Sequence, residues 1–168
     1  MRVAVFSPDG RWLLTASGDA TARLWDVERG GPLQTLRVGL PLSTAAFAPD
    51  GARFALGALH AAGTVWLVDI GADRALHPRV LQSGHEGRIW SLAFSPDGQT
   101  LLSTADDGTA RLWAVAGGAV GREPRVLRGH RDQLRHAAFS ADGARVVTAS
   151  LDGTARLWDA TSGAELAL

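Results

Sequence analysis

Short apolar runs alternate with turn signals along this chain, without the 3.6-residue spacing of an amphipathic helix. Residues 95–113, SPDGQTLLSTADDGTARLW, show the pattern most clearly. The Pro-Asp-Gly at 96–98 predicts a tight turn, because proline fixes φ and glycine accepts a positive φ. An apolar run over 101–104, an Asp-Gly hairpin turn at 107–108 and a third run over 110–115 follow. This pattern predicts short antiparallel strands.

The same arrangement occurs four times. Its markers are four turn aspartates and four tryptophans: Asp9, Asp50, Asp97 and Asp142, and Trp25, Trp66, Trp113 and Trp158. The interval from aspartate to tryptophan is identical in all four copies, so variation in length falls between a tryptophan and the next turn. A fixed register with a period in the forties indicates a repeat array. We therefore expect an all-β fold in which each copy is a four-stranded antiparallel meander.

Composition narrows the classes of function. Formal net charge is zero, and all 17 basic residues are arginine, a usage that resembles GC-rich coding bias. Zero net charge argues against a nucleic-acid or anionic-membrane surface. Cysteine is absent, which excludes disulfides and thiolate sites. No apolar run approaches a membrane span of about 20 residues, and the first residues enter a strand pattern rather than a signal peptide. We expect a cytoplasmic protein.

Motifs for catalysis or cofactor binding are absent. The chain has no GxSxG elbow, no GxxxxGK[ST] phosphate loop and no HExxH pair, so we expect no catalytic residue, cofactor or metal. His130, Ser150 and Asp152 superficially match a Ser-His-Asp triad. A structural role for these three residues is favoured, because a nucleophile also needs substrate access and an oxyanion hole.

Several short motifs resemble the WD-repeat family. They are Trp-Asp at 25–26 and 158–159, Gly-His at 84–85 and 129–130, the SPDG turn and the TARLW strand. The resemblance covers essentially the whole chain. It implies a β-propeller, in which four-stranded blades surround a central channel. It also implies a platform that holds protein or peptide partners. The blades are expected at approximately 1–38, 39–83, 84–128 and 129–168, in one WD-repeat region.

The family resemblance further implies a hydrogen-bonded tetrad in each blade, formed by a histidine, a Ser/Thr, an aspartate and the tryptophan. The fourth copy would supply all members: His130, Ser150, Asp152 and Trp158. The third would supply His85, Asp107 and Trp113, with Ala105 where the serine is expected. The first would supply Ser17, Asp19 and Trp25.

The second copy departs furthest from this pattern. Val38, Ala58 and His60 stand at the other tetrad positions, so only Trp66 remains. A buried polar network stabilises a protein only when its members are satisfied. We therefore expect this blade to be held by apolar packing and to be the loosest.

The stretch after Gly-His would, by resemblance, form the rim where members of the family bind partners. The candidate rim residues are Arg88, Trp90, Gln133, Arg135, Asp106 and Leu151. Tryptophan and arginine are enriched in interaction hot spots. The alternative for Trp90 is that it packs between blades.

These observations predict a non-catalytic protein-interaction scaffold, as part of a larger propeller. Its partner would be a protein or peptide, with no nucleic acid or membrane. Four blades that do not close leave an apolar face at each end. The chain is therefore expected to be a fragment of a longer WD-repeat protein or to close an eight-bladed ring as a homodimer. The alternative function is an accessory or sensor tail of a longer multidomain signalling enzyme whose catalytic domain lies elsewhere.

Overall fold

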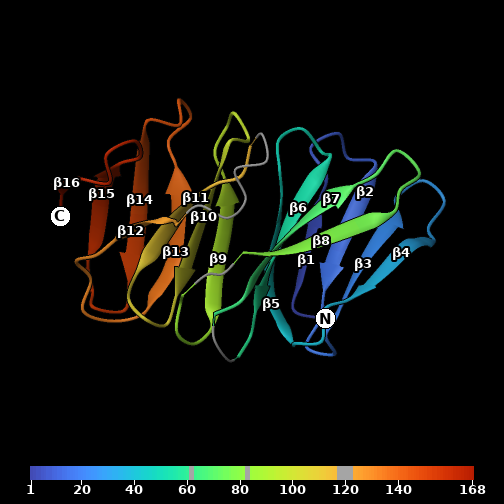
Figure 1. Ribbon diagram of the computed structural model, residues 1–168, viewed down its shortest axis with the longest axis horizontal. Coiled ribbons are helices and arrows are strands. Elements are labelled where there is room, and N and C mark those ends of the chain that lie inside the picture. The colour runs from blue at the N-terminus through green and yellow to red at the C-terminus, as the bar shows by residue number, and fades with distance from the viewer. Residues whose placement is uncertain (61–62, 82–83, 117–122) are drawn as a thin grey trace.

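The computed structural model describes residues 1–60, 63–81, 84–116 and 123–168. Within these residues the chain forms sixteen strands and no helix, which confirms the all-β prediction. The strands build four antiparallel sheets of four strands each. Figure 1 shows the sheets side by side in a row, with the last sheet at one end and the first two at the other.

In each sheet, the four strands are hydrogen-bonded to one another in the order in which they occur along the chain. Sheet one holds β1 (Val3–Phe6), β2 (Trp12–Ala16), β3 (Thr21–Asp26) and β4 (Pro32–Arg37). Sheet two holds β5 (Leu42–Phe47), β6 (Arg53–Ala58), β7 (Val65–Ile70) and β8 (Leu76–Leu81). Sheet three holds β9 (Ile89–Phe94), β10 (Thr100–Ala105), β11 (Ala110–Ala114) and β12 (Arg125–Leu127). Sheet four holds β13 (Leu134–Phe139), β14 (Arg145–Ser150), β15 (Ala155–Asp159) and β16 (Glu165–Ala167).

The turn between the first two strands has the same construction in all four sheets. The turn aspartate accepts a hydrogen bond from the N–H two residues ahead, as Asp97 Oδ1 does from Gln99 N at 2.9 Å. The glycine after it has a positive φ, which is 68° at Gly98. Because glycine has no Cβ, it adopts this conformation without strain. The repeated aspartate therefore marks a repeated backbone geometry.

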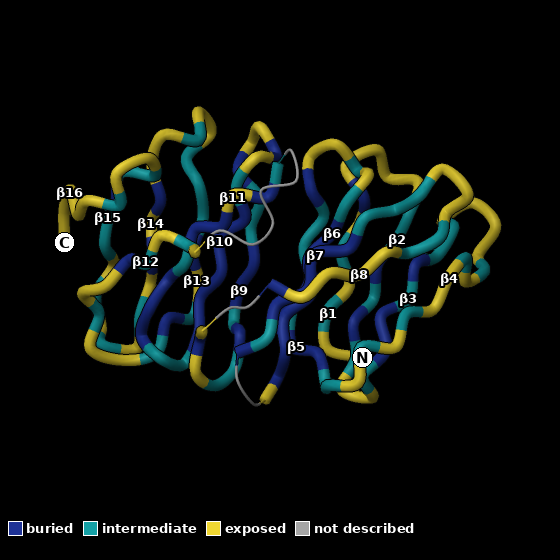
Figure 2. Tube along the Cα trace, viewed as in Figure 1, coloured by how far each residue is buried: buried dark blue, intermediate teal, exposed yellow. Residues whose placement is uncertain are grey.

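The hydrophobic core lies between neighbouring sheets rather than within one sheet. Leu102 and Leu112 of sheet three pack in one cluster with Val146 and Trp158 of sheet four. Similar clusters join sheets one and two, and sheets two and three. Figure 2 shows the buried trace in the middle of the row. The face of each sheet that carries the repeat tryptophan position therefore packs on the opposite face of the preceding sheet.

The two ends of the row are uncovered. Leu102 is 1% exposed between sheets three and four, whereas Val147, at the same repeat position in sheet four, is 44% exposed. At the other end Phe6 is 64% exposed, while its counterparts in sheets two to four are half-buried. Among the residues that the structure describes, no sheet covers the outer face of sheet one or the outer face of sheet four.

The prediction that Trp66 keeps the tryptophan position of the tetrad is wrong. Leu13 of sheet one and Phe54 of sheet two each lie four residues after their turn aspartate. Leu13 pairs with Trp25, but Phe54 pairs with Val68. The loop that joins β6 to β7 is two residues longer than the loop that joins the second and third strands of each other sheet. Trp66 therefore lies two residues before the tetrad position, opposite Leu56, even though its interval from the turn aspartate equals that in the other copies.

Apolar side chains fill the centre of sheet two instead of a polar network. Phe54, Leu56, Trp66 and Val68 are all buried, in the cluster that sheet two shares with sheet one. Trp66 takes the position held by an arginine in the other three sheets. That this is the least stable of the four sheets stays a prediction.

Candidate interaction surface and the polar networks beneath it

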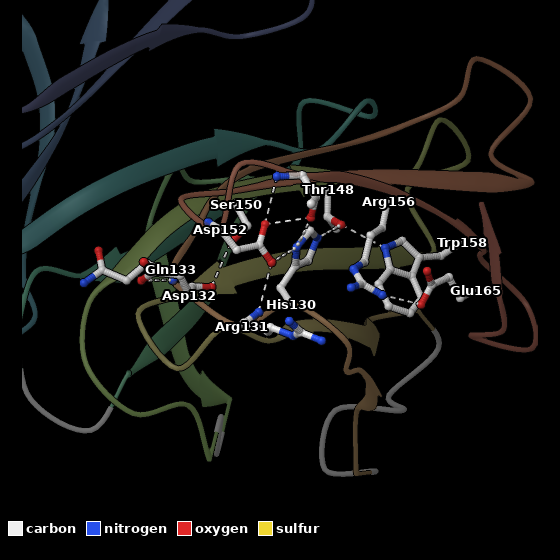
Figure 3. Close-up of polar contacts among 11 residues, drawn as sticks. His130, Arg131, Asp132, Gln133, Thr148, Ser150, Asp152, Arg156, Trp158 and Glu165 are labelled. Atoms are coloured by element: carbon white, nitrogen blue, oxygen red, sulfur yellow. Dashed lines mark hydrogen bonds and ion pairs between the residues drawn. The ribbon is translucent and has the colours of Figure 1, made fainter. Parts of the chain in front are cut away.

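A buried polar network joins the strands of sheet four (Figure 3). His130 Nδ1 lies 2.9 Å from Asp152 Oδ2, and His130 Nε2 lies 2.8 Å from Thr148 Oγ1. Trp158 Nε1 donates to the same threonine oxygen at 2.9 Å. The pKa of Asp152 is lowered, so its carboxylate can only accept, and His130 therefore carries a proton on Nδ1 and donates it to Asp152. With the proton of the neutral ring on Nδ1, Nε2 accepts from the Thr148 hydroxyl.

The hydroxyl of this tetrad belongs to Thr148 and not to Ser150. Ser150 Oγ instead donates to Asp132 O at 2.9 Å and accepts from Asp152 N at 3.1 Å. Trp158 pairs with Val146 in the register of β14 and β15, so its diagonal neighbour on the same face is Thr148. Ser150 lies on that face too but two residues farther along the strand, out of reach of the indole.

Sheet three holds the same network, complete. His85 Nδ1 lies 2.9 Å from Asp107 Oδ2, and His85 Nε2 lies 2.9 Å from Ser103 Oγ. Trp113 Nε1 donates to Ser103 Oγ at 3.0 Å. The expectation that Ala105 leaves a gap was wrong for the reason seen in sheet four: the hydroxyl lies two residues earlier in the strand.

Sheet one holds part of the network. Trp25 Nε1 donates to Thr15 Oγ1 at 2.9 Å, so Thr15 and not Ser17 supplies the hydroxyl. Asp19 accepts from the N–H and the hydroxyl of Thr21, and these hydrogen bonds lower the pKa of its carboxyl to about 2. Ser17 Oγ accepts a long bond of 3.4 Å from Asp19 N.

Burial decides the charge state of the network in sheet three. Burial raises the pKa of Asp107, but hydrogen bonds from His85 and Thr109 outweigh it and hold that pKa well below the ordinary value. Burial lowers the pKa of His85, and Asp107 opposes this effect only in part. A neutral imidazole beside an ionised carboxylate is therefore the native state.

This charge state predicts a loss of stability on mild acidification. In the unfolded chain His85 takes up a proton below its ordinary pKa of about 6.5, whereas in the folded chain it resists protonation. The contribution is therefore full above about pH 6.5 and is lost as the pH falls below it. We expect the free energy of unfolding, measured by urea denaturation, to drop by about 1 kcal/mol between pH 7 and 5.5.

Two variants separate His85 from the other histidines. His85→Gln should flatten the pH dependence, because glutamine has no proton to gain. His60→Gln is the matched control, since His60 is exposed. An unchanged slope in His85→Gln would contradict the assignment.

At the edge of sheet three, Trp90 lies between two guanidinium groups. The Cζ atoms of Arg88 and Arg135 are 3.6 and 3.5 Å from the centroid of the Trp90 ring. Trp90 Nε1 donates to Asp106 Oδ1 at 2.6 Å, and Arg88 N donates to Asp106 Oδ2 at 2.9 Å. The four residues are half-buried. Four of the six predicted rim residues thus meet in one cluster.

The remaining two rim residues lie along the same edge in sheet four. Leu151 N donates to Gln133 O at 2.9 Å, just as Asp106 N donates to Arg88 O in sheet three. The Leu151 side chain is 52% exposed. The predicted rim therefore follows a single edge of sheets three and four.

Arg2 acts electrostatically on Arg88 and was not among the rim residues predicted from the sequence. Its positive charge, after burial, lowers the pKa of Arg88, so the two side chains lie near each other. A signal was present: Arg2, Trp90 and Arg135 each precede a turn aspartate by seven residues.

The structure separates the residues that resemble a catalytic triad. Ser150 makes no hydrogen bond to His130 in the part of the chain that is described, and the histidine is committed to Thr148 and Asp152. Over residues 1–60, 63–81, 84–116 and 123–168, no three His, Asp or Glu side chains gather in a way that could hold a metal ion. Those same residues contain no helix long and apolar enough to span a membrane.

These sheets, with their His-Ser/Thr-Asp-Trp networks, define a repeat protein of the propeller-blade type. The family described as "WD domain, G-beta repeat" matches residues 1–26, 78–114 and 121–159. The chain belongs to the WD40 repeat family. Most of sheet two falls outside the matched ranges, in keeping with its displaced tryptophan.

Three curated relatives illustrate the similarity. Serine-threonine kinase receptor-associated protein of Dictyostelium discoideum is 31% identical over 108 residues, which are 64% of this chain and 35% of the relative. The guanine nucleotide-binding protein subunit beta of Oryza sativa subsp. indica is 35% identical over 120 residues, 67% of this chain and 31% of the relative. Eukaryotic translation initiation factor 3 subunit I of Drosophila willistoni is 36% identical over 115 residues, 63% and 36%. The chain spans about a third of each.

Proposed function

We propose that this chain is a non-catalytic protein-interaction scaffold and forms one WD-repeat region, residues 1–168, of a larger propeller. One observation supports the proposal most directly: the polar side chains along one edge of sheets three and four fall into two groups. The His, Ser/Thr and Asp side chains are hydrogen-bonded to one another in buried networks. The surface of the edge carries Arg88, Trp90, Arg135 and Leu151, which are half-buried or exposed. Arginine and tryptophan are typical anchors of protein interfaces.

The relatives' names agree with a role in assemblies: one is receptor-associated and two are subunits. Net charge of zero supports a protein partner over a nucleic acid. We also propose a cytoplasmic location, which the absence of cysteine supports.

Site-specific photo-crosslinking tests the scaffold proposal. A photoreactive amino acid at Leu151 reports on the rim, and the same group at Thr161, exposed in the β15–β16 turn of the same sheet, is the matched control. We expect discrete crosslinks to a protein partner from position 151 and none from position 161. Equal yields at both positions, or none at 151, would contradict a partner surface on this edge.

The uncovered end faces support a second proposal, that two copies of this chain associate. The tryptophan-bearing face of each sheet packs on the opposite face of the sheet before it, so the free faces of sheets one and four are the two halves of one interface. Two copies joined head to tail at both ends would close a ring of eight blades. A longer chain that supplies further blades is the alternative.

Light scattering distinguishes the two arrangements. Association predicts twice the 17.6 kDa mass of the single chain, and Val147→Asp, which places a charge in the free face of sheet four, should shift the mass to that of one copy. A folded, monodisperse single chain at the same concentration would contradict association.

A further inference from the structure

Arg88, Trp90 and Arg135, here called the Arg-Trp-Arg cluster, hold two positive charges on one indole. Two guanidinium carbons at 3.6 and 3.5 Å from the same centroid would overlap on a single face. They therefore lie on opposite faces, and the two distances together place them about 7 Å apart. Each stacking contact is a favourable cation–π interaction, but the two cations repel each other.

The charge of this cluster is incompletely balanced. Arg2 adds a third nearby cation, which acts on Arg88 together with Arg135. Asp106 is the carboxylate that contacts the cluster, and its two oxygens accept from uncharged N–H groups, the indole of Trp90 and the backbone of Arg88. Among the described residues no ion pair within 4.0 Å includes any of the three arginines. Neither stacked guanidinium group is therefore paired with a carboxylate within 4.0 Å among the described residues.

The stacking also fixes which atoms can bind a ligand. The Nε atoms of Arg88 and Arg135 are buried and lack a hydrogen-bond partner in the described structure. Both residues are half-buried, which leaves part of each side chain at the surface, and the Nη1 and Nη2 groups along one edge of each guanidinium are the donors that a ligand there would use. Each edge presents two parallel N–H groups, which match the two oxygens of a carboxylate.

We propose that the Arg-Trp-Arg cluster binds an acidic segment of a protein partner, with one carboxylate on Arg88 and a second on Arg135. This proposal rests on the proposed scaffold function and specifies the chemistry of its partner. The spacing of the guanidinium groups sets the sequence of the segment. Residues i and i+2 of an extended strand lie on one face about 6.5–7 Å apart, which matches the separation of the two Cζ atoms. A Glu-Xaa-Glu or Asp-Xaa-Asp segment in extended conformation satisfies both.

The surroundings of the cluster favour a short acidic peptide over a nucleic acid. The positive charge is local, because the whole chain has zero net charge. Leu151, exposed on the same edge, offers an apolar contact beside the charges. A peptide side chain can use such a contact, whereas a phosphate backbone cannot.

Fluorescence anisotropy of a labelled peptide tests the proposal. The probe is fluorescein-labelled Ser-Gly-Glu-Ser-Glu-Gly-Ser, and its counterpart with both glutamates replaced by glutamine removes only the charges. We expect the full chain to bind the first peptide, with affinity falling as salt rises, and to bind the second at least about tenfold more weakly. Arg88→Gln and Arg135→Gln should each weaken binding about tenfold.

Arg37→Gln is the matched control, because it makes the same change of charge on the exposed outer strand β4, and it should stay within about twofold of the wild type. Arg88→Lys keeps the charge but loses the planar edge, so we expect it to bind with intermediate affinity. This variant keeps the test informative if the glutamine variants fail to fold. Near-ultraviolet circular dichroism of each variant checks the tryptophan packing.

Three results would overturn the proposal. The first is equal binding of both peptides, and the second is binding that Arg88→Gln and Arg37→Gln weaken equally. The third is that a single-stranded oligonucleotide or a phosphoserine peptide binds, that its binding requires Arg88 and Arg135, and that the glutamate peptide does not bind. If crosslinks from position 151 persist in the Arg88→Gln, Arg135→Gln chain, the scaffold function stands and only the acidic-segment inference fails.

Discussion

Replacing Ser103 with alanine should lower the free energy of unfolding by about 2–4 kcal/mol. Ser103 is fully buried, and its Oγ accepts from Trp113 Nε1 while it donates to His85 Nε2. Alanine removes both bonds and leaves two buried polar groups without partners, each of which costs about 1–3 kcal/mol. Urea denaturation followed by tryptophan fluorescence measures the effect.

Ser103→Thr is the matched control for this prediction. Thr148 makes the same two bonds at the same position of sheet four, so threonine keeps the network, and we expect a change below about 1 kcal/mol. Ser150→Ala is a second comparison. Ser150 is outside the indole's reach and partly exposed, so its loss should cost less than that of Ser103. A larger loss for Ser150→Ala than for Ser103→Ala would contradict the corrected tetrad.

Replacing Gly63 with alanine should lower the free energy of unfolding by about 2–5 kcal/mol. Gly63 has a φ of +49°, and a Cβ built there would overlap His85 Cβ and lie 2.6 Å from the His85 carbonyl oxygen. The added methyl group therefore clashes with backbone that also positions the network of sheet three. We expect the loss to appear in urea denaturation.

Gly10→Ala isolates the contribution of backbone strain. Gly10 has a φ of +72°, but no other residue's atom lies within 4 Å of its built Cβ. Its substitution should cost about 1–2 kcal/mol, the strain of a left-handed residue alone. Equal losses at the two glycines would show that the contact between Gly63 and His85 does not limit stability.

Local signals were sufficient for the architecture. The turn at Asp97 and Gly98 depends on a few neighbouring residues, so its four copies could be read directly from the chain. The Asp-Gly hairpin at 107–108 recurs at 152–153. The strands between them followed from short apolar runs. The histidine, aspartate and tryptophan of the networks in sheets three and four lie where the family resemblance implied.

The same local signals do not determine which residues of neighbouring strands pair with each other. Thr148 and Ser150 share a face of β14, since side chains alternate with a period of two, and either could have met the histidine. Only the pairing of Val146 with Trp158 decides for Thr148. The same shift explains why Ser103 and not position 105 completes sheet three.

Sheet two shows how an intact spacing in sequence can conceal a shift in structure. The interval from Asp50 to Trp66 is the same as in every other repeat, yet the longer β6–β7 hairpin moves Val68 into the tetrad position. Counting from the turn could not detect this change. When a hairpin loop is longer, a tryptophan at the same interval from the turn aspartate lies earlier in the following strand, so the interval in sequence stays the same.

The sequence by itself determined the number of repeats, the four-stranded meander and the absence of known catalytic motifs, because each depends on residues close together in the chain. Tertiary structure alone decided which hydroxyl joins each network, where Trp66 packs, and that Arg88 and Arg135 stack on Trp90. These outcomes depend on strand register and on contacts between separate sheets. Trp90 and Arg135 lie one repeat apart in sequence, and their side chains become neighbours only when the sheets pack.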